Sequence, residues 1–491
     1  MFESAELGHS ISKAQYEKEV PILREELLEA QLDLRQCGKF QVIVLIGGVD
    51  GAGKSETVKI LNEWMDPRYI ETNAMSASSE EELAHPAMWR FWRALPPRGK
   101  IGIFFGSWYT EPIINRVNRR IKVPDFDQAM EQIIHFENML CDEGALILKF
   151  WLHLSKEAQK NRLKTLEKDP DTRWRVTEAE WEHFKLYDKF RKVSSRALTL
   201  TSTAEAPWII VEGTDPRFRY MTIGRNILSA LKKRLEGGGH RPVSQAPPAL
   251  PPIDNKFLLK SLDFSQSMSK KAYEKELDKY QRKLNLIVRN RKFKKLSVIL
   301  VFEGFDAAGK GGAIRRIAGA LDPRTYRIIP IAAPTEEEKA QPYLWRFWRH
   351  IPKKGDFTIF DRSWYGRVLV ERVEGYCSEA DWMRAYREIN DFEEQLIRNG
   401  SALIKFWLSI TKEEQLKRFK EREKTSFKHF KITEEDWRNR KNWDKYEIAC
   451  GDMIDRTSME LSPWTIIEAN DKYFARIKIL KQVCSRIEEV F

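Results

Sequence analysis

Residues 298–310 read VILVFEGFDAAGK, and residues 42–54 read VIVLIGGVDGAGK. In each stretch a short apolar run, rich in β-branched residues, leads into a glycine-rich turn that ends in lysine. Such a run is typical of a buried parallel strand. The glycines let the following backbone curl so that its N–H groups point inward, and a helix that begins there adds partial positive charge. The pattern Gly304-x-x-x-x-Gly309-Lys310 therefore indicates a phosphate-binding loop, and the chain carries this loop twice.

The two loops belong to a duplication that runs along the 491-residue chain. Lys54 and Lys310 lie 256 positions apart, and the same offset aligns many further residues. Clear matches are DPR at 66–68 and 322–324, WRFWR at 89–93 and 345–349, and KFW at 149–151 and 405–407. A period of this length indicates two fused domains and not a solenoid array.

Strand and helix patterns alternate within each half, which is typical of a doubly wound α/β sheet. Each half opens with an amphipathic, charge-rich helix, near 13–36 and 269–292. Further strands of the second half are expected at 327–332, 357–361, 402–409 and 464–469. Residues 236–255 are rich in glycine and proline and predict a linker. We therefore expect one domain at 1–235, this linker, and a second domain at 256–491.

Composition narrows the class of protein. No run of about 18 apolar residues occurs, and the amino terminus is polar, so we expect a cytoplasmic protein without a membrane segment. The five cysteines never pair as CxxC and the eight histidines lack ligand spacing, which argues against a zinc site. The net charge of +12 suggests a polyanionic partner: nucleic acid, an acidic membrane surface or a phosphate-rich substrate.

Two aspartates are the candidate metal ligands of the second half. P-loop enzymes usually follow the loop lysine with Ser or Thr, which holds Mg²⁺. The first half has Ser55 there, but the second half has Gly311. A magnesium ion in the second half must therefore draw on other oxygens. The available carboxylates are Asp306, inside the loop, and Asp361, at the end of a predicted strand where the ligands of α/β sheets gather. The alternatives are a helix or turn cap for Asp361 and a loop-stabilising carboxylate for Asp306.

Arginines follow the second of these aspartates closely. Arg362 comes directly after it, and Arg367 and Arg372 lie a few residues on. Guanidinium groups suit phosphate because they are planar, always charged and bidentate. The sequence offers no HRD-type base and no obvious Ser/His or Cys/His pair. If the attacking group is the phosphate of a nucleotide, it is already an anion, so Mg²⁺, lysine and arginine suffice without a base.

A second basic cluster, residues 416–431, follows a late predicted strand. Arg418 and Arg422 fall on one face if this segment is helical, and Lys428 and Lys431 occupy a less regular part. A mobile basic flap in this place is how P-loop kinases close over the transferring phosphate and exclude water. The alternative is a solvated, charged helix.

Tryptophans beside arginines leave two interpretations open. WRFWR at 345–349 and SWY at 363–365 place aromatic rings next to guanidinium groups, as nucleic-acid-binding proteins do. Trp345 and Trp348 lie three positions apart, so they also fit a helix face packed on a sheet. We favour the packed core over a stacking platform for bases.

The second half resembles the polyphosphate kinase 2 family over about residues 260–491. The resemblance is carried by the loop at 304–310, DRSWYGR at 361–367 and VER at 370–372, and by Lys428, Phe430, Lys431, Trp443 and Tyr446, which are similar to that family's lid. Two fused copies resemble its AMP-using class. The resemblance implies two tandem P-loop kinase-like domains, each a mostly parallel sheet flanked by helices with a helical lid.

The same resemblance implies a reaction and its partners. The terminal phosphate of inorganic polyphosphate is transferred to AMP, giving ADP, with Mg²⁺ as the cofactor. The excess of basic residues then has a natural partner in the polyphosphate chain, so we expect neither nucleic acid nor a membrane as a partner. Members of the family tend to associate, which implies a homodimer of two-domain chains.

Individual roles also follow from the resemblance. Asp306 and Asp361 serve the metal, and Lys310, Arg362 and the lid arginines hold phosphates. Whether Arg418 or Arg422 is the lid arginine stays open at this point. The implied phosphate-binding set is Gly304, Gly309, Lys310, Gly311, Gly312, Lys428 and Lys431. The implied nucleotide-binding set is Arg367, Glu371 and Arg372.

The first half resembles the same family but departs from it at decisive positions. Phe105 and Gly106 stand where the second half has Asp361 and Arg362. The other replacements are Glu111 for Arg367, Asn115 for Glu371, Leu166 for Arg422 and Thr172 for Lys428. The residual phosphate loop keeps Gly48, Asp50, Gly53, Lys54 and Ser55. We predict a non-catalytic copy and leave open whether it binds phosphate.

Three other functions stay open at this point. An ATP-dependent nucleoside monophosphate kinase would use the same loop with a nucleotide donor. The charge and the Trp/Arg clusters suggest a nucleic-acid-binding P-loop ATPase, although no helicase-like or RNA-binding motif supports it. A regulatory protein that binds polyphosphate without turnover is the last alternative.

Overall fold

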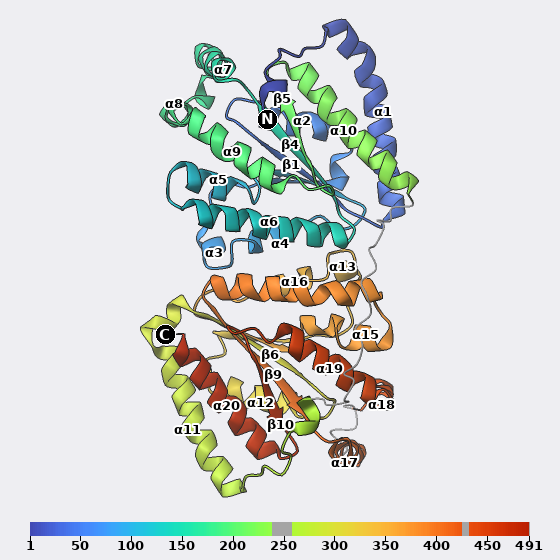
Figure 1. The fold of residues 1–491 in the computed structure, drawn as a ribbon, viewed down its shortest axis with the longest axis vertical. Helices are drawn as coiled ribbons and strands as arrows, with labels where there is room; N and C mark the ends of the chain where they lie inside the picture. Colours follow the sequence, from blue (N-terminus) through green and yellow to red (C-terminus); the bar gives the residue numbers. More distant parts are fainter. Residues whose placement is uncertain (238–257, 425–431, 491) are drawn as a thin grey trace. The chain divides into compact units, whose positions relative to one another are not determined.

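The computed structural model describes residues 1–237, 258–424 and 432–490 (Figure 1). The chain forms two compact units, each of which centres on one five-stranded sheet. Of the described residues, 1–78, 90–237 and 335–345 belong to the first unit, and 79–89, 258–334, 346–424 and 432–490 belong to the second. The predicted linker at 236–255 lies almost wholly outside the described residues, so the boundaries 1–235 and 256–491 stay a prediction.

The first sheet is parallel throughout, with the strand order β2-β3-β1-β4-β5. Its strands are β1 (Val42–Gly48), β2 (Ile70–Ala74), β3 (Ile101–Phe105), β4 (Leu146–His153) and β5 (Trp208–Glu212). The central strand β1 pairs with β3 on one side and β4 on the other. Burial on both sides explains why its sequence is an unbroken apolar run.

The second sheet repeats this order as β7-β8-β6-β9-β10, again with parallel pairing throughout. Its strands are β6 (Ser297–Gly304), β7 (Tyr326–Pro330), β8 (Phe357–Asp361), β9 (Ser401–Ser409) and β10 (Trp464–Glu468). The predicted α/β fold with two tandem parallel sheets is therefore confirmed. The strand predicted at 357–361 has those bounds, whereas β7 ends two residues before the predicted end.

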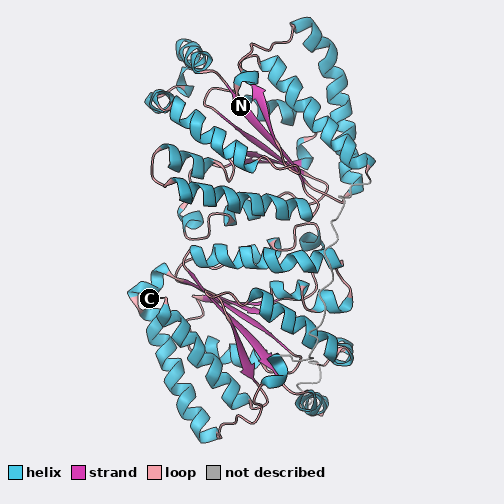
Figure 2. Cartoon of the chain, in the orientation of Figure 1, coloured by secondary structure: helices cyan, strands magenta, loops and turns pink. Residues whose placement is uncertain are grey.

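Helices cover both faces of each sheet (Figures 1 and 2). In the first unit, α1 (Lys13–Cys37), α2 (Lys54–Trp64) and α10 (Pro216–Glu236) form one layer, and α5 (Thr110–Val117), α6 (Val123–Asp142) and α9 (Tyr187–Thr201) form the other. In the second unit, the layers are α11 (Lys270–Arg289), α12 (Lys310–Ala318) and α20 (Lys472–Glu489), and α15 (Val370–Glu374), α16 (Glu379–Arg398) and α19 (Trp443–Thr457). The remaining α-helices are α3 (Glu80–Leu83), α4 (Trp89–Arg93), α7 (Lys156–Lys168), α8 (Glu178–Lys185), α13 (Glu336–Lys339), α14 (Trp345–Trp348), α17 (Lys412–Glu423) and α18 (Glu434–Lys441).

A buried ion pair joins the sheet of each unit to its helices. In the second unit, Lys405 on β9 is fully buried, and its Nζ donates to Glu393 Oε2 and to the carbonyl oxygen of Thr457, both at 2.7 Å. Trp364 Nε1 and the Tyr365 hydroxyl donate to the other oxygen of Glu393 at 3.0 and 2.5 Å. The residues 256 positions earlier form the same network in the first unit: Lys149, Glu137, Thr201, Trp108 and Tyr109. The SWY motif therefore serves the core, which explains why both halves keep it.

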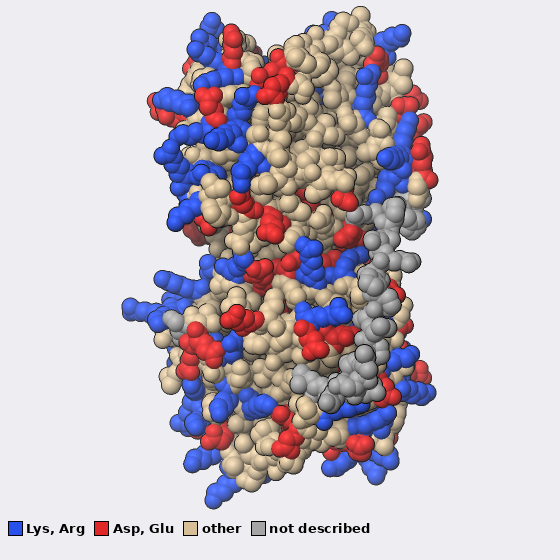
Figure 3. Space-filling view, viewed as in Figure 1, with Lys and Arg blue, Asp and Glu red and all other residues tan. Residues whose placement is uncertain are grey.

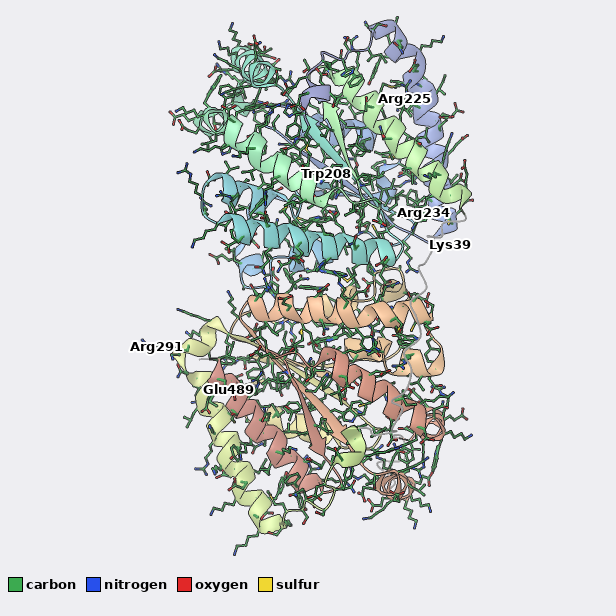
Figure 4. All side chains as sticks on the ribbon, viewed as in Figure 1. Lys39, Trp208, Arg225, Arg234, Arg291 and Glu489 are labelled. Carbon is green, nitrogen blue, oxygen red and sulfur yellow. The ribbon has the colours of Figure 1, made fainter. Side chains whose placement is uncertain are left out.

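The tryptophans that suggested two interpretations are buried. Trp348 is 1% exposed, and its ring packs edge-on against Phe392 at a centroid distance of 5.0 Å. Trp364 is 0% exposed. Outside these motifs, Trp208 on β5 of the first unit, labelled in Figure 4, is half-buried and donates from Nε1 to the buried Thr201 hydroxyl at 2.9 Å. These contacts confirm the packed-core interpretation over a stacking platform.

The surface mixes both signs of charge. On the face shown in Figure 3, basic and acidic side chains are interspersed over each unit. Across the described ranges, no helix combines the length and the apolar character needed to cross a bilayer.

Candidate active site

The phosphate-binding loop of the second unit joins β6 to α12. Gly304 has a φ of +143°, and a Cβ there would lie 2.3 Å from the carbonyl oxygen of Leu408, so the loop can leave the strand only through glycine. A Cβ built on Gly309 or Gly311 would meet no described atom within 4 Å, so the loop is open where α12 begins. Lys310 reaches back over the loop, and its Nζ donates to the Gly304 carbonyl at 2.7 Å.

Asp361 and Arg362 lie beside this loop, at the end of β8. The pairing of β8 with β6 sets Asp361 opposite Phe302. Arg362 has a left-handed backbone with a φ of +64°, and its N–H donates to the Phe302 carbonyl at 3.0 Å. Such a conformation is uncommon outside glycine and clusters at functional sites. The side chain donates from Nη2 to Asp306 Oδ1 at 3.2 Å, and its Nη1 lies 3.5 Å from Glu435 Oε1.

The carboxylates around Arg362 favour its charged form. Burial acts to lower its pKa, but Asp306, Glu435 and Glu303 outweigh this effect and raise the pKa of Arg362. The side chain is nevertheless 41% exposed, so a phosphate group in solution can reach it. A permanent, planar cation beside the loop is the group that phosphate recognition requires.

Helix α18 contacts the loop aspartate from another direction. The helix begins behind Thr433 with a capping box. Asn439 donates from Nδ2 to Asp306 Oδ2 at 2.8 Å, and the Tyr446 hydroxyl donates to Asn439 Oδ1 at 3.1 Å. Asp306 thus has Arg362 on one oxygen and Asn439 on the other. Sequence reasoning missed Asn439, because it lies 133 residues from Asp306 in a segment without a motif.

The side chain of Arg418 on α17 contacts the backbone of the loop. The side chain is buried, and its Nε pairs with Glu414 at 2.7 Å. Its other nitrogens donate to four carbonyl oxygens at 2.7–3.1 Å, those of Ala307, Ala308, Ala469 and Asn470. The five N–H groups of the guanidinium therefore have five acceptors. This geometry favours a positioning role for Arg418, in which it ties the loop to the turn after β10.

Arg422 lies one helical turn after Arg418 and is half-buried. With Arg418 engaged by the backbone, Arg422 is the better candidate for a lid arginine that touches phosphate. Lys428 and Lys431, the other basic residues predicted for the lid, lie outside the described residues.

The predicted nucleotide-binding residues follow β8 on a 3₁₀ turn and on α15. Arg367 pairs through Nε with Glu371 Oε2 at 3.2 Å. The guanidinium of Arg372 lies 4.1 Å from the centroid of the Trp382 ring, and its Nη1 is 2.7 Å from Asp452 Oδ2. The contacts of Arg372 join α15 to α16 and α19, and the pair of Arg367 and Glu371 joins the 3₁₀ turn to α15.

Glu303, directly before the loop, is a buried carboxylate that sequence reasoning passed over. The Ser363 hydroxyl donates to its Oε1 at 2.8 Å, which ties the end of β6 to the segment after Asp361. Burial raises the pKa of Glu303, against the opposing effects of the Ser363 hydrogen bond and the Lys310 charge. The available signal was a lone acid in an apolar strand, at a position where the first half has Gly47.

The first unit has the same loop in different surroundings. Lys54 donates from Nζ to the Gly48 carbonyl at 2.8 Å, as its counterpart does in the second unit. Asp50 lies 3.4 Å from Lys54 Nζ and 3.2 Å from His183 Nδ1. Burial acts to raise the pKa of Asp50, but the charges of Lys54 and His183 outweigh it and lower the pKa. β3 ends at Phe105, so the first unit lacks the acid and the guanidinium that lie at the end of β8 in the second unit.

Comparisons with known proteins agree with this geometry. The family described as Polyphosphate kinase 2 (PPK2) matches residues 10–237 and again residues 267–490. Polyphosphate:AMP phosphotransferase of Pseudomonas aeruginosa is 57% identical over 494 residues, which cover 100% of this chain and 99% of that protein. The protein of the same name from Acinetobacter johnsonii is 38% identical over 472 residues, which cover 94% and 95% of the two chains.

A solved structure matches the whole chain as well. The crystal structure of a polyphosphate kinase 2 from Pseudomonas aeruginosa PA01 superposes with a TM-score of 0.90 at 55% identity, covering 100% of this chain and 99% of that chain. The resemblance inferred from the motifs is thus confirmed for both halves. This chain belongs to the polyphosphate kinase 2 family.

Proposed function

We propose that this chain transfers the terminal phosphate of inorganic polyphosphate to AMP, giving ADP, at the loop of the second unit. The supporting observation is the convergence of Asp306, Lys310, Asp361 and Arg362 on one open phosphate loop. The chain also matches, over its full length, proteins named polyphosphate:AMP phosphotransferase. In the first unit, only the aspartate and the lysine of this set remain.

The reaction needs positioning and charge neutralisation more than proton transfer. A phosphate oxygen of AMP attacks the terminal phosphorus of the polyphosphate, and the bond to the next phosphate breaks, so a shorter polyphosphate leaves. The attacking oxygen is already anionic, so no base is required. Lys310 and Arg362 carry fixed positive charge beside the loop and would stabilise the negative charge gathered in the transition state.

Mg²⁺ would be held by Asp306 and Asp361. This donor set fits the ion, because Mg²⁺ is usually bound by one or two carboxylates together with substrate phosphates and waters. The parts of the chain that the structure describes contain no cluster of three or more His, Cys, Asp or Glu side chains suited to a metal, so substrate oxygens would complete the shell. When bound, the ion neutralises charge on the phosphates between donor and acceptor.

The remaining predicted residues take supporting roles in this proposal. Gly304, Gly309, Gly311 and Gly312 allow the loop and the start of α12 to approach the phosphates, and Arg422, Lys428 and Lys431 are the basic residues of the lid. Arg367, Glu371 and Arg372 contact the nucleotide. A homodimer of two-unit chains, which the family resemblance implies, stays a prediction that light scattering would test.

A donor and acceptor assay tests the proposed function. Purified chain, Mg²⁺, AMP and long-chain polyphosphate, without ATP, should yield ADP, whereas Asp361→Asn protein should not. A panel of other nucleoside mono- and diphosphates measures the preference for the acceptor. Production of ADP only when ATP is supplied would instead identify an ATP-dependent nucleoside monophosphate kinase. Hydrolysis of ATP that is stimulated by single- or double-stranded nucleic acid would identify the P-loop ATPase considered above.

A further inference from the structure

The phosphate loop of the first unit lies next to a carboxylate that the second unit lacks. Glu56 stands on the first turn of α2, two residues after Lys54, where the second unit has Gly312. Its Oε1 lies 2.8 Å from Arg162 Nη2 and 3.5 Å from Arg175 Nη1. Its Oε2 lies 3.0 Å from Arg219 Nη2. A single carboxylate is therefore surrounded by three guanidinium groups, as a bound phosphate would be.

Arg219 brings this cluster against the loop itself. Its side chain is 2% exposed and donates to the Gly213 carbonyl at 2.7 Å and to the Thr57 hydroxyl at 3.1 Å. A Cβ built on the loop glycine Gly53 would lie 2.3 Å from the Arg219 guanidinium carbon. The space beside the last loop glycine is thus filled in the first unit, whereas it is open at Gly309 in the second.

The second unit differs in sequence at three of the four positions that build the cluster. Gly312 replaces Glu56, Ala475 replaces Arg219, and Lys431 replaces Arg175. Arg418 corresponds to Arg162, but its guanidinium donates to backbone carbonyls instead. The cluster is therefore a feature of the first unit and not of the shared fold.

We infer that Glu56 is an internal anion that closes the first unit's loop to phosphate chains. A carboxylate in the first turn of a helix takes up the positive potential that the helix N-terminus offers to phosphate. Because Glu56 is tethered beside its three arginines, an external anion must compete with a very high effective concentration. Removal of its charge would leave Arg162, Arg175 and Arg219 beside an intact loop, which uncovers a site for inorganic oligophosphate.

Hydrogen–deuterium exchange on the full-length chain tests this inference, with tripolyphosphate as the probe and without Mg²⁺ or AMP. In the unaltered protein we expect ligand-induced protection at 304–318 and none at 48–60. Glu56→Gln keeps the shape of the side chain and should bring protection at 48–60, with half-protection at a tripolyphosphate concentration at least about tenfold below the highest one at which the unaltered protein shows none. Glu63→Gln, at the exposed end of the same helix, is the matched control and should behave as the unaltered protein.

Glu56→Gly introduces the residue of the second unit and removes the whole side chain. This variant should also gain ligand-induced protection at 48–60. If the amides of β1 exchange faster in Glu56→Gly protein without ligand, this variant has unfolded the first unit. The Glu56→Gln variant alone then tests the inference. Protection at 48–60 in the unaltered protein, or its absence in a folded Glu56→Gln protein, would overturn the inference. The inference rests on the proposed function only for the choice of tripolyphosphate as the probe. Without AMP and Mg²⁺ the exchange experiment measures binding and no turnover, so a failure of this experiment is distinct from a failure of the AMP assay.

Discussion

The first and second units share a scaffold but not the surroundings of their loops. The buried lysine–glutamate distance is 2.7 Å in both, and each loop lysine donates to the first loop glycine at 2.7–2.8 Å. The differences begin where β3 and β8 end, with Phe105 and Gly106 in one unit and Asp361 and Arg362 in the other. The comparison teaches that the fold can hold a phosphate loop in place without the acid and the guanidinium that we propose to act in the second unit.

The largest loss of stability is expected from substitutions at the buried ion pair that both units share. Lys405→Met and Lys149→Met should each reduce the free energy of unfolding of their own unit by about 3–5 kcal/mol, because each leaves a buried glutamate without its charge partner. Denaturant unfolding, with exchange at β9 and β4 to assign the unit, measures both effects. Lys59→Met, at an exposed position, is the control and should change stability by less than about 0.5 kcal/mol. A large effect in only one unit would contradict the equivalence of the two scaffolds.

The difference between the loops should appear most strongly in turnover. Asp361→Asn and Lys310→Ala should each lower kcat by about 10²–10³-fold, because each removes a charge that acts on the transferring phosphate. Lys54→Ala, the matched variant in the first unit, should leave the rate of ADP formation close to that of the unaltered protein. Steady-state assays with polyphosphate and AMP, with circular dichroism to confirm folding, measure all three. Equal losses from Lys54→Ala and Lys310→Ala would place chemistry in both units.

Much of the fold could be predicted from the sequence, because the signals are local. The strand at 42–48 is an apolar run that ends in glycine, and the loop at 304–310 is set by two glycines and a lysine within seven residues. The repeat added a second signal, because a position that differs between the halves marks chemistry more sharply than either half alone. That contrast singled out Asp361 and Arg362.

The rest of the site depends on contacts between distant residues. Arg418 and Arg422 are alike in sequence, and only the backbone carbonyls that surround Arg418 in the folded chain separate a positioning arginine from a candidate ligand. Glu303 is coupled to Ser363, 60 residues away, and Asn439 to Asp306, 133 residues away. No periodicity or motif links such pairs, so a single sequence gives no means to find them.

The positioning role of Arg418 predicts an effect of intermediate size. Arg418→Lys keeps the charge but cannot reach the four carbonyl oxygens that the planar guanidinium bridges. We expect kcat to fall about tenfold, as the loss of one or two hydrogen bonds implies, together with faster amide exchange at 304–310. Arg422→Lys is the matched variant one turn away and should raise KM for polyphosphate without loosening the loop. Unchanged exchange in Arg418→Lys protein would rule out the positioning role.

Glu303, near the end of β6, tests a further difference between the two units, because the first unit has Gly47 at this position. Glu303→Ala removes the acceptor of the Ser363 hydroxyl and should lower kcat by about fivefold to tenfold, whereas Glu303→Gln keeps an acceptor and should cost less. Ser363→Ala should match Glu303→Ala if the hydrogen bond is the cause. Equal losses in the Gln and Ala variants would instead assign the effect to the lost negative charge.

The raised pKa of Glu303 also predicts a pH dependence of stability. Between the ordinary glutamate pKa and the raised value, the folded state binds more protons than the unfolded state, so the free energy of unfolding falls as pH rises through this window. Glu303→Gln lacks that titration, and its stability relative to the unaltered protein should therefore increase from acidic to neutral pH. Denaturant unfolding at several pH values measures the difference. A difference that stays constant with pH would show that Glu303 titrates normally.

The smallest effect is expected from an attempt to restore the first unit. Phe105→Asp with Gly106→Arg, placed in the Asp361→Asn background so that any gain is visible, should add no measurable ADP formation. Gly106 has a φ of +76°, and a Cβ there would lie 2.4 Å from the Met75 carbonyl oxygen, so the new arginine meets a clash with the backbone of the first unit.

Even a correctly placed arginine would find its partners missing. Ala179 stands where Glu435 contacts Arg362, Leu166 stands where Arg422 follows on the lid, and Arg219 fills the space beside the loop glycine. Phe105→Asp alone, which avoids the clash, is the control for folding. ADP formation clearly above the Asp361→Asn background would mean that acid and arginine are sufficient on this scaffold. The predicted lack of activity in the first unit would then depend on two residues and not on the whole surroundings of its loop.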